Sequence, residues 1–289
     1  MKRERFGIAV RILLVCIGVA ILIYPSLSEY LSEKNSSTAI VTYDDSVAKA
    51  NEKMLDEILA RAREYNKELA YQSGFGKPVV NDYGEPLSLE GYDELLNLDG
   101  DGMMGYINIP CLNVTVPIYH TTNESVLQVG IGHIENTSLP VGGESSHSVL
   151  SGHTGLPTKS LFTDLDQMKI GDRFFIKVLN ETLCYTVDEI NVVLPYETEK
   201  LAIVEGEDYC TLITCTPYGI NDHRLLVRGK RTEYNPETIK EEMASETENL
   251  SIWMRMPMQY RHFITGALVI VLLVAIKLLI MVIQRLLRK

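Results

Sequence analysis

Residues 209–230 read Tyr209-Cys-Thr-Leu-Ile-Thr-Cys215, then Thr216-Pro-Tyr-Gly219, and then, after three residues, His223-Arg-Leu-Leu-Val-Arg-Gly-Lys230. Two apolar, β-branched runs flank a loop that contains proline and glycine, which is typical of two strands joined by a turn. A hairpin of this kind places Arg224 across from Cys215. Because side chains alternate along a strand, Cys215 and Cys210 are expected on opposite faces and not in a disulfide.

The same pattern extends upstream of this hairpin. Further strands are predicted at residues 106–109, 114–119, 148–153, 173–179 and 183–193. Many short strands with few helices predict a mainly β domain, either a closed or nearly closed barrel or a sandwich.

Residues 43–104 precede the strands and have two parts. Residues 43–70 predict an amphipathic helix with Asp44, Asp45 or Ser46 at its start, and its apolar face contains Val47, Met54, Ile58, Ala62, Tyr65 and Leu69. Residues 71–104 are rich in glycine, aspartate, asparagine and proline, which predicts a long irregular segment, typical of a lid, a binding loop or a linker. Asp99-Gly-Asp-Gly102 is interpreted as a turn, since the remaining ligands of a calcium loop are missing.

Two hydrophobic runs lie at the ends of the chain. The first, residues 12–24, follows a basic cluster and fits either a signal peptide or an uncleaved anchor; counting from Phe6 to Leu27 favours the anchor. The second, residues 263–283, is interrupted only by Lys277 and ends in basic residues, which predicts a transmembrane helix. The positive-inside rule then places both ends in the cytoplasm and the middle outside.

The charge distribution excludes one class of partner. The formal charge is −11, from 27 basic and 38 acidic residues, and basic residues are concentrated at the two ends. The middle of the chain is therefore strongly acidic, which argues against nucleic acid as a partner. The apolar share of 46% is ordinary for a globular protein and excludes a disordered chain.

Three residues have the surroundings expected of reactive groups. Cys215 ends a strand beside a Pro/Gly loop, which holds a nucleophile rigidly and leaves it accessible. Arg224 has guanidinium donors for a developing oxyanion and helps to hold a thiolate. His153 ends the strand Ser148-Val-Leu-Ser-Gly-His153 between two glycines and is the best acid/base candidate, whereas His133 and His147 lie in loop-like sequence.

The cysteines do not indicate a metal site or a disulfide framework. Cys16 belongs to the first hydrophobic run, and the other four lack a C-x-x-C pair or a regular spacing. A Cys111–Cys184 bridge is left open by the even count. No metal and no cofactor is predicted.

Three motifs resemble those of sortases, and specifically of class C, the pilin-polymerising sortases. They are Leu150-Ser-Gly-His153-Thr-Gly-Leu156, Thr211-Leu-Ile-Thr-Cys215-Thr-Pro-Tyr218 and Asn221-Asp-His-Arg224-Leu-Leu-Val-Arg-Gly229. The resemblance covers roughly residues 105–232, and two terminal membrane runs also fit class C. It implies Cys215 as nucleophile, His153 as acid/base and Arg224 as oxyanion-stabilising group, the same three residues that their surroundings single out.

The resemblance implies a closed sortase β-barrel of about eight strands, with an N-terminal amphipathic helix and two terminal transmembrane helices. The expected organisation is an anchor or signal at 1–27, the helix and lid-like segment at 43–104, the catalytic barrel at 105–232, an acidic stalk at 233–262 and a transmembrane helix at 263–284.

The activity implied by the resemblance is that of a cysteine transpeptidase in the cell membrane with its catalytic domain outside. Its partners would be secreted pilins or surface proteins with a C-terminal L-P-x-T-G-like motif, cleaved between Thr and Gly and joined to a pilin lysine. Two alternatives remain: a sortase that anchors proteins to peptidoglycan, and a non-enzymatic membrane-tethered adhesion or binding module.

Class C sortases commonly carry a lid with Asp-Pro followed by an aromatic residue. Here the corresponding segment reads Asn81-Asp82-Tyr83-Gly84-Glu85-Pro86, so Asp82 and Tyr83 are the candidate lid residues, although no proline separates them.

Overall fold

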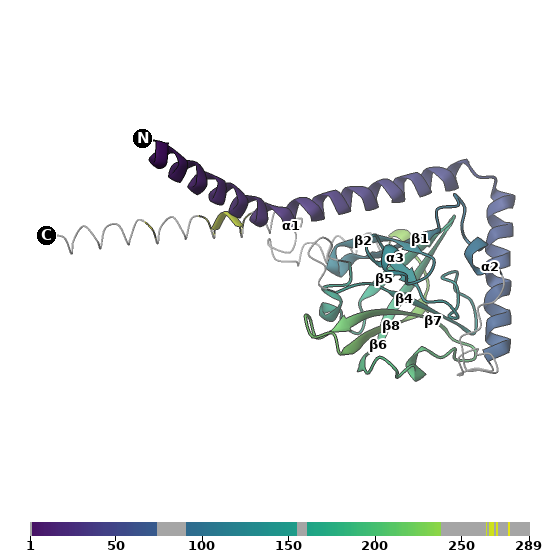
Figure 1. Cartoon of the computed structure of the whole chain (residues 1–289). Helices are drawn as coiled ribbons and strands as arrows, with labels where there is room; N and C mark the ends of the chain where they lie inside the picture. The colour runs from purple at the N-terminus through teal and green to yellow at the C-terminus, as the bar shows by residue number, and fades with distance from the viewer. Residues whose placement is uncertain are drawn as a thin grey trace. The chain divides into compact units, whose positions relative to one another are not determined.

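The computed structural model describes residues 2–73, 91–154 and 161–237, and, near the C-terminus, residues 264, 266–268, 270 and 277. The chain divides into two compact units (Figure 1). One comprises residues 1–33, 157–159 and 249–289, and its described part is mainly helical. The other comprises residues 34–156 and 160–248 and contains the β-barrel. No helix formed by the described residues is both long enough and apolar enough to cross a membrane.

Two helices occupy the N-terminal quarter of the chain, α1 (Lys2–Lys49) and α2 (Glu52–Ser73). The single helix predicted over residues 43–70 is therefore wrong at its start, because α1 continues through residue 49 and the break lies at residues 50–51. Asn51 explains the break: its side chain accepts a hydrogen bond from the amide of Lys53 at 3.0 Å, which caps α2. The predicted cap at Asp44, Asp45 or Ser46 lies inside α1.

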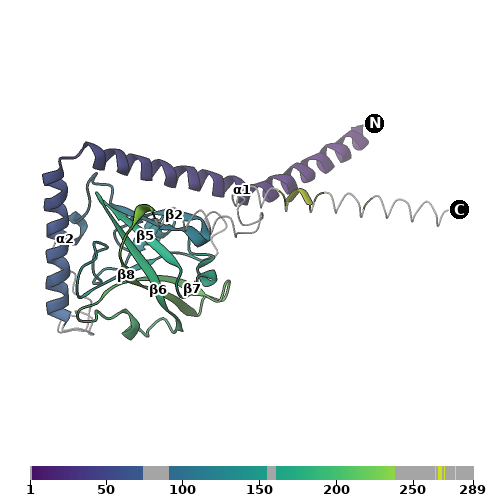
Figure 2. The ribbon, with the colours of Figure 1, turned by 180° about the vertical axis from the view of Figure 1, so that it is seen from behind.

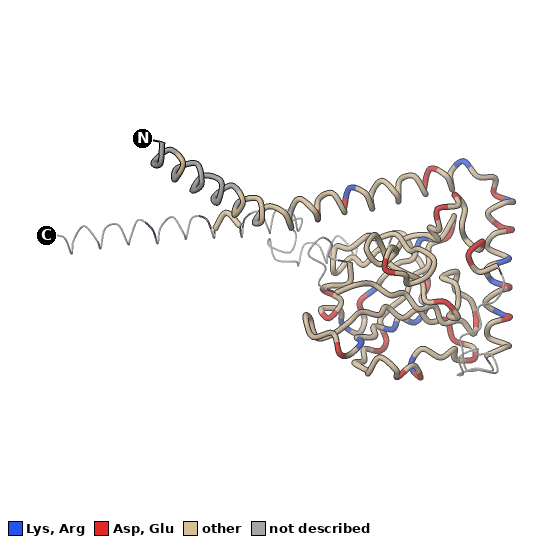
Figure 3. Tube along the Cα trace, viewed as in Figure 1, with Lys and Arg blue, Asp and Glu red and all other residues tan. Residues whose placement is uncertain are grey.

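Helix α2 is amphipathic, with acidic and basic residues alternating along it (Figure 3). Its buried residues are Leu55, Leu59, Ala62, Tyr65, Asn66, Leu69, Ala70 and Ser73. The prediction was correct for Ala62, Tyr65 and Leu69, but Met54 is 47% exposed and Leu55 is buried in its place. Val47 and Ile58 are partly buried and pack against the same core, so the predicted face differs mainly at Met54.

Eight strands form a closed barrel in the order β1-β2-β3-β4-β7-β8-β6-β5 (Figures 1 and 2). Their bounds are β1 Met103–Ile109, β2 Val114–Tyr119, β3 Ile131–His133, β4 Ser146–Ser151, β5 Arg173–Val178, β6 Glu181–Val193, β7 Asp208–Thr216 and β8 His223–Thr232. A short helix, η1 Tyr92–Glu94, precedes β1, and the short helices between the strands are η2 Pro110–Leu112, α3 Glu124–Leu127, η3 Leu165–Gln167 and η4 Glu199–Leu201. The predicted β-barrel is confirmed, and the sandwich is excluded because β5 pairs with β1 and closes the sheet.

Two of the strand pairs are parallel and the others are antiparallel. Strand β2 pairs in parallel with β3, and β4 pairs in parallel with β7. Parallel neighbours end at the same edge of a sheet. Consequently β4 and β7, which are about sixty residues apart in sequence, end side by side.

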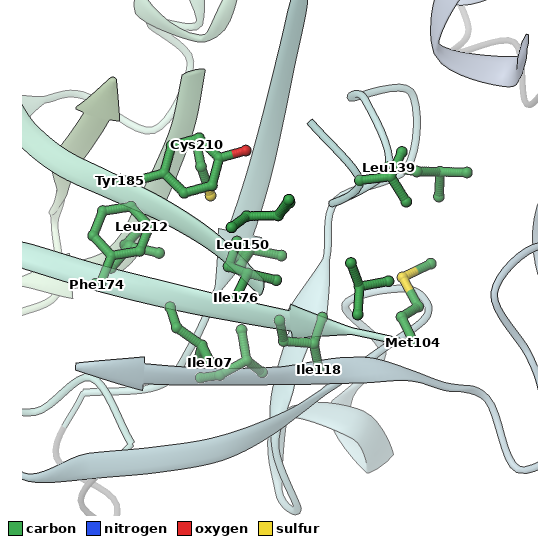
Figure 4. Packing of buried hydrophobic residues seen from close by; sticks show 14 of the residues in the cluster. Met104, Ile107, Ile118, Leu139, Leu150, Phe174, Ile176, Tyr185, Cys210 and Leu212 are labelled. Atoms are coloured by element: carbon green, nitrogen blue, oxygen red, sulfur yellow. The ribbon is translucent and has the colours of Figure 1, made fainter. Parts of the chain in front are cut away.

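The barrel interior is filled by apolar side chains from almost every strand (Figure 4). Labelled examples are Met104, Ile107, Ile118, Leu150, Phe174, Ile176, Tyr185 and Leu212. The rings of Phe174 and Tyr185 stack with centroids 5.4 Å apart. A Cβ on Gly229 of β8 would come within 2.5 Å of Phe174, so the glycine makes room for this stacked pair.

The end of α1 is fixed to the barrel through Tyr43. Its hydroxyl donates to the carbonyl of Met104 at 2.9 Å and accepts from the amide of Leu179 at 2.7 Å. Burial of the ring raises the pKa of Tyr43 well above its ordinary value. The hydroxyl therefore stays protonated and satisfies two barrel groups, one on β1 and one in the β5–β6 turn.

Candidate functional site

The parallel pairing of β4 with β7 brings His153 beside Cys215. Ser151, the last residue of β4, is paired with Ile213 of β7. His153 follows Ser151 by two residues, and Cys215 follows Ile213 by two residues. Because neighbouring strands lie about 5 Å apart, this register places the two residues side by side at the same edge of the barrel.

The antiparallel pairing of β7 with β8 adds Arg224 to this edge. Cys215 is directly paired with Arg224, which confirms the cross-strand placement predicted from the sequence. Arg224 is also paired with Val193 at the end of β6. The three adjacent strands β4, β7 and β8 therefore present His153, Cys215 and Arg224 in that order along one rim of the barrel.

The two cysteines of β7 lie in different environments. Cys210 is fully buried in the barrel interior, and this burial raises the pKa of its thiol well above the ordinary value. Cys215 lies five residues later, on the opposite face, and is partly exposed. Only a thiolate is an effective nucleophile, so Cys210 is inert and Cys215 is the thiol of this strand that a substrate can reach.

The guanidinium of Arg224 is oriented by backbone carbonyls. Nη1 donates to the carbonyl of Asn221 at 3.2 Å and to that of His223 at 3.0 Å. These bonds orient the guanidinium of a residue whose backbone is paired with Cys215, and among the described residues Nη2 and Nε have no hydrogen-bond acceptor. The neighbouring His223 instead pairs with Asp222, and its Nδ1 lies 2.8 Å from the carboxylate. This hydrogen bond lowers the pKa of Asp222.

The backbone before His153 is closely packed. A Cβ on Gly152 would come within 2.6 Å of Ile131 and 2.7 Å of Phe162, so any larger residue would have to displace these side chains. The hydroxyl of Thr214 donates to the carbonyl of Gly152 at 2.8 Å, and the amide of Phe162 donates to that of His153 at 3.2 Å. These contacts hold the end of β4 against the end of β7.

The imidazole of His153 has a carboxylate beside it that the sequence does not reveal. Nε2 of His153 lies 3.6 Å from Oε2 of Glu124, and the side chains are 27% and 71% exposed, respectively. Glu124 begins α3, a helix of four residues that is too short to produce a periodic pattern. Its position twenty-nine residues before His153 gives no spacing signal either.

Three other histidines are structural. Both ring nitrogens of His120, His133 and His147 lie within hydrogen-bond distance of protein groups. Burial lowers the pKa of His133 and of His147 to about 4. Neither ring is charged near neutral pH, so neither is suited to donate a proton at the rim.

One open alternative is decided by the structure, and other predicted features fall outside the described residues. Cys184 is a buried free thiol, so the bridge to Cys111 does not form. Within the described ranges, no group of three or more residues is arranged to hold a metal ion. The lid candidates Asp82 and Tyr83, the stalk beyond residue 237 and most of the C-terminal run lie outside the described residues.

Comparison with known proteins places this rim and barrel in a family. Residues 107–232 match the family described as the sortase domain. The structure is similar to that of sortase C1 from Streptococcus agalactiae, with 47% identity, a TM-score of 0.63 and coverage of 68% of this chain and 100% of that chain. It is also similar to sortase C of Streptococcus pneumoniae, with 42% identity, a TM-score of 0.59 and coverage of 68% and 97%.

Curated sequences agree at the level of the domain. Sortase A of Streptococcus agalactiae is 29% identical over 117 residues, which are 39% of this chain and 47% of that protein. The match to sortase A of Bacillus anthracis spans 61% of that protein at 28% identity. The chain thus spans about half to two thirds of the length of these curated relatives.

The chain belongs to the sortase family, whose members are cysteine transpeptidases. Both of the solved structures reported above are class C sortases, which places this chain in that class.

Proposed function

We propose that this protein is a membrane-anchored class C transpeptidase that cleaves an L-P-x-T-G-like motif between Thr and Gly and joins the acyl product to a pilin lysine. The observation that carries the proposal is the alignment of His153, Cys215 and Arg224 on three adjacent strand ends. The similar structure of sortase C from Streptococcus pneumoniae is described as giving insight into catalysis and pilin substrate specificity, which supports a pilin as partner.

In the first step, the thiolate of Cys215 attacks the threonine carbonyl carbon. Arg224, aligned by its two carbonyl contacts, stabilises the oxyanion with its remaining donors. His153 as imidazolium gives its proton to the glycine nitrogen as the Thr–Gly bond breaks. The products are a thioester on Cys215, a free amine on the departing peptide and a neutral imidazole.

In the second step, the lysine amine attacks the thioester carbonyl. His153 accepts the proton that the amine loses, and the sulfur of Cys215 leaves as thiolate. An isopeptide bond forms, and the enzyme returns to its starting state. No oxidant, reductant or cofactor is required.

The decisive experiment is trapping of the acyl intermediate. The full chain in detergent micelles, mixed with an L-P-x-T-G peptide, should gain the mass of the peptide up to threonine on Cys215. Cys215→Ala should show no such gain, and Cys210→Ala serves as the matched control. Absence of the adduct on the unaltered protein would favour the adhesion-module alternative.

The acceptor is tested separately. If a pilin lysine is the acceptor, as proposed, cells should contain a ladder of covalent pilin multimers. A sortase that anchors proteins to peptidoglycan would give only wall-linked monomers. Detection of monomers alone would be consistent with the proposed thioester chemistry, but it would show that the acceptor is peptidoglycan and not a pilin lysine.

We further propose that the terminal hydrophobic runs, residues 12–24 and 263–283, hold the protein in the cell membrane with its barrel outside. The basic residues that flank both runs support this orientation. Protease added to intact cells should digest the barrel and spare epitope tags at both ends. Recovery of a protein that lacks its first residues would show that the first run is a cleaved signal.

A further inference from the structure

The carboxylate of Glu124 faces the imidazole of His153. Its Oε2 lies 3.6 Å from Nε2 of the ring. This Nε2 is buried and has no hydrogen-bond partner among the residues that the structure describes. Among the described residues, the carboxylate of Glu124 is thus the polar group at ion-pair distance from this buried nitrogen.

The other oxygen of the carboxylate is held in place. The side-chain amide of Gln128 donates to Oε1 of Glu124 at 2.5 Å, and the backbone amide of Gln128 donates to the carbonyl of Glu124 at 3.0 Å. Helix α3 in turn packs against β3, the barrel neighbour of β4. Glu124 thus has Oε1 on Gln128 and Oε2 on the side of His153, although its side chain is 71% exposed.

The four groups form one series across the rim. Following the barrel order β3, β4, β7 and β8, they are Glu124 on α3 above β3, then His153, Cys215 and Arg224. We propose that Glu124 is a positioning residue that orients His153 and stabilises its protonated form. The proposal rests on the proposed function, because it assumes that the imidazolium of His153 donates the proton to the leaving amine. An acid, a histidine and a nucleophile in this order follow the general logic of hydrolase triads.

The other charged groups near His153 do not replace Glu124. Arg224 is a cation on β8 and disfavours a second positive charge at the rim. The carboxylate of Asp222 is engaged by His223, and that of Asp164, in the segment packed behind His153, accepts from Gln167 at 2.8 Å. Apart from the transient thiolate of Cys215, Glu124 is thus the described anion positioned to stabilise the imidazolium.

The kinetic consequence depends on pH. An ordinary thiol has a pKa near 8.5 and an ordinary imidazole one near 6.5, so between these values only a small fraction carries both thiolate and imidazolium. Within that interval, the active fraction falls whenever the imidazolium is destabilised. At more acidic pH the imidazole is protonated in any case, and the active fraction depends on the thiol alone.

The test is the pH dependence of kcat/KM for the full chain in detergent micelles, measured with an L-P-x-T-G peptide from pH 5 to 9. Glu124→Gln should lower kcat/KM roughly two- to fivefold at pH 7.5, the effect of an exposed ion pair. The lower inflection of its profile should move to more acidic pH, and the two profiles should converge near pH 5. Glu124→Asp, which keeps the charge, should lose less than Glu124→Gln.

The matched control is Glu144→Gln, the same change of charge at an exposed position in the loop before β4, at the opposite end of the barrel. It should leave the profile unchanged. A profile of Glu124→Gln equal to that of the unaltered protein, or lowered by the same factor at every pH, would overturn the proposal. Failure of the unaltered protein to form the thioester would instead reject the proposed function.

Discussion

Two arginines on the same strand show how the wall of the barrel differs from its rim. Arg228, in the middle of β8, makes a bidentate contact with Asp188 at 3.0 and 2.7 Å and an ion pair with Glu189 at 2.8 Å. Its guanidinium also lies 4.2 Å from the ring centroid of Tyr209. The hydrogen bond to Asp188 raises the pKa of Arg228. The partners of this guanidinium all lie within the barrel wall, so its role is to stabilise the fold.

Arg224, four residues earlier, contacts backbone carbonyls instead. In the part of the chain that the structure describes, no carboxylate forms an ion pair with it. The same contrast separates buried Cys210 from accessible Cys215 on β7. Side chains of the wall use their polar groups within the fold, whereas those of the rim are oriented and left available to a substrate.

The largest expected effect on activity is that of replacing Cys215, with Cys210 on the same strand as its comparison. Cys215→Ala should lower the rate of peptide joining by at least about a thousandfold, because no other described thiol lies at the rim. Cys210→Ala should retain activity and lose about 1–2 kcal/mol of stability through the small cavity it leaves. A joining assay and chemical denaturation measure the two quantities; substantial activity in the Cys215 variant would contradict the assignment.

The two arginines should separate activity from stability. Arg224→Gln should lower kcat by about 10²–10³-fold, as for other lost oxyanion donors, with little change in the free energy of unfolding. Arg228→Gln should lower that free energy by about 1–3 kcal/mol, because it leaves Asp188 partly buried without its cation, whereas Glu189 keeps its ion pair with Lys200. If the folded Arg228 variant lost as much kcat as the Arg224 variant, the distinction between wall and rim would fail.

The buried histidines predict loss of stability in acid. The pKa of His133 and His147 is about 4 in the folded state, below the value near 6.5 of an unfolded chain. The unfolded chain therefore binds more protons between these values, and stability should fall as pH falls from 6.5 to 4, by roughly 3 kcal/mol for each ring. Burial raises the pKa of Asp208, which acts in the opposite direction and reduces the net loss.

Urea denaturation at pH 7.5, 6 and 5 measures this dependence. His147→Gln keeps an amide able to bond Ala202 and Thr211 and should show a shallower decline over the same interval. Equal slopes for the two proteins would argue against a neutral, buried imidazole at position 147.

The last prediction concerns stability alone and tests the packing beneath the rim. Gly152→Ala introduces a methyl group against Ile131 and Phe162 and should cost about 1–3 kcal/mol of stability. Ser151→Ala, at the neighbouring position, is the control. Gly143→Ala is unsuitable, because the positive φ of Gly143 would strain alanine whatever its packing. Thermal denaturation gives both values, and a Gly152 variant as stable as the unaltered protein would show that the end of β4 shifts freely.

The strands were predictable where their sequence is long and apolar. The predicted strand at residues 114–119 has the observed bounds, and the others differ by up to three residues at an end. Strand β3 was missed because three residues cannot show an alternating pattern. The break between α1 and α2 was missed because a single side chain, Asn51, decides it.

The site was predictable in part for a similar reason. Cys215 and Arg224 are joined by one hairpin, so local sequence was enough to pair them. The neighbourhood of His153 and Cys215 depends on the parallel pairing of two distant strands, which no local pattern reveals; the resemblance to sortases supplied it. Glu124 had neither signal, because its relation to His153 is purely spatial.

The attachment of Tyr43 would have a mechanical consequence if the N-terminal run anchors the protein, as proposed above. The residues bonded to its hydroxyl, Met104 and Leu179, lie near the start of β1 and at the β5–β6 turn, whereas β6 reaches Arg224 only at its far end, Val193. A pulling force on α1 is thus transmitted to the barrel at the end remote from Cys215. A pulling force on this side would therefore strain the hydrogen bonds of Tyr43 before it could separate the strand ends that form the proposed active site.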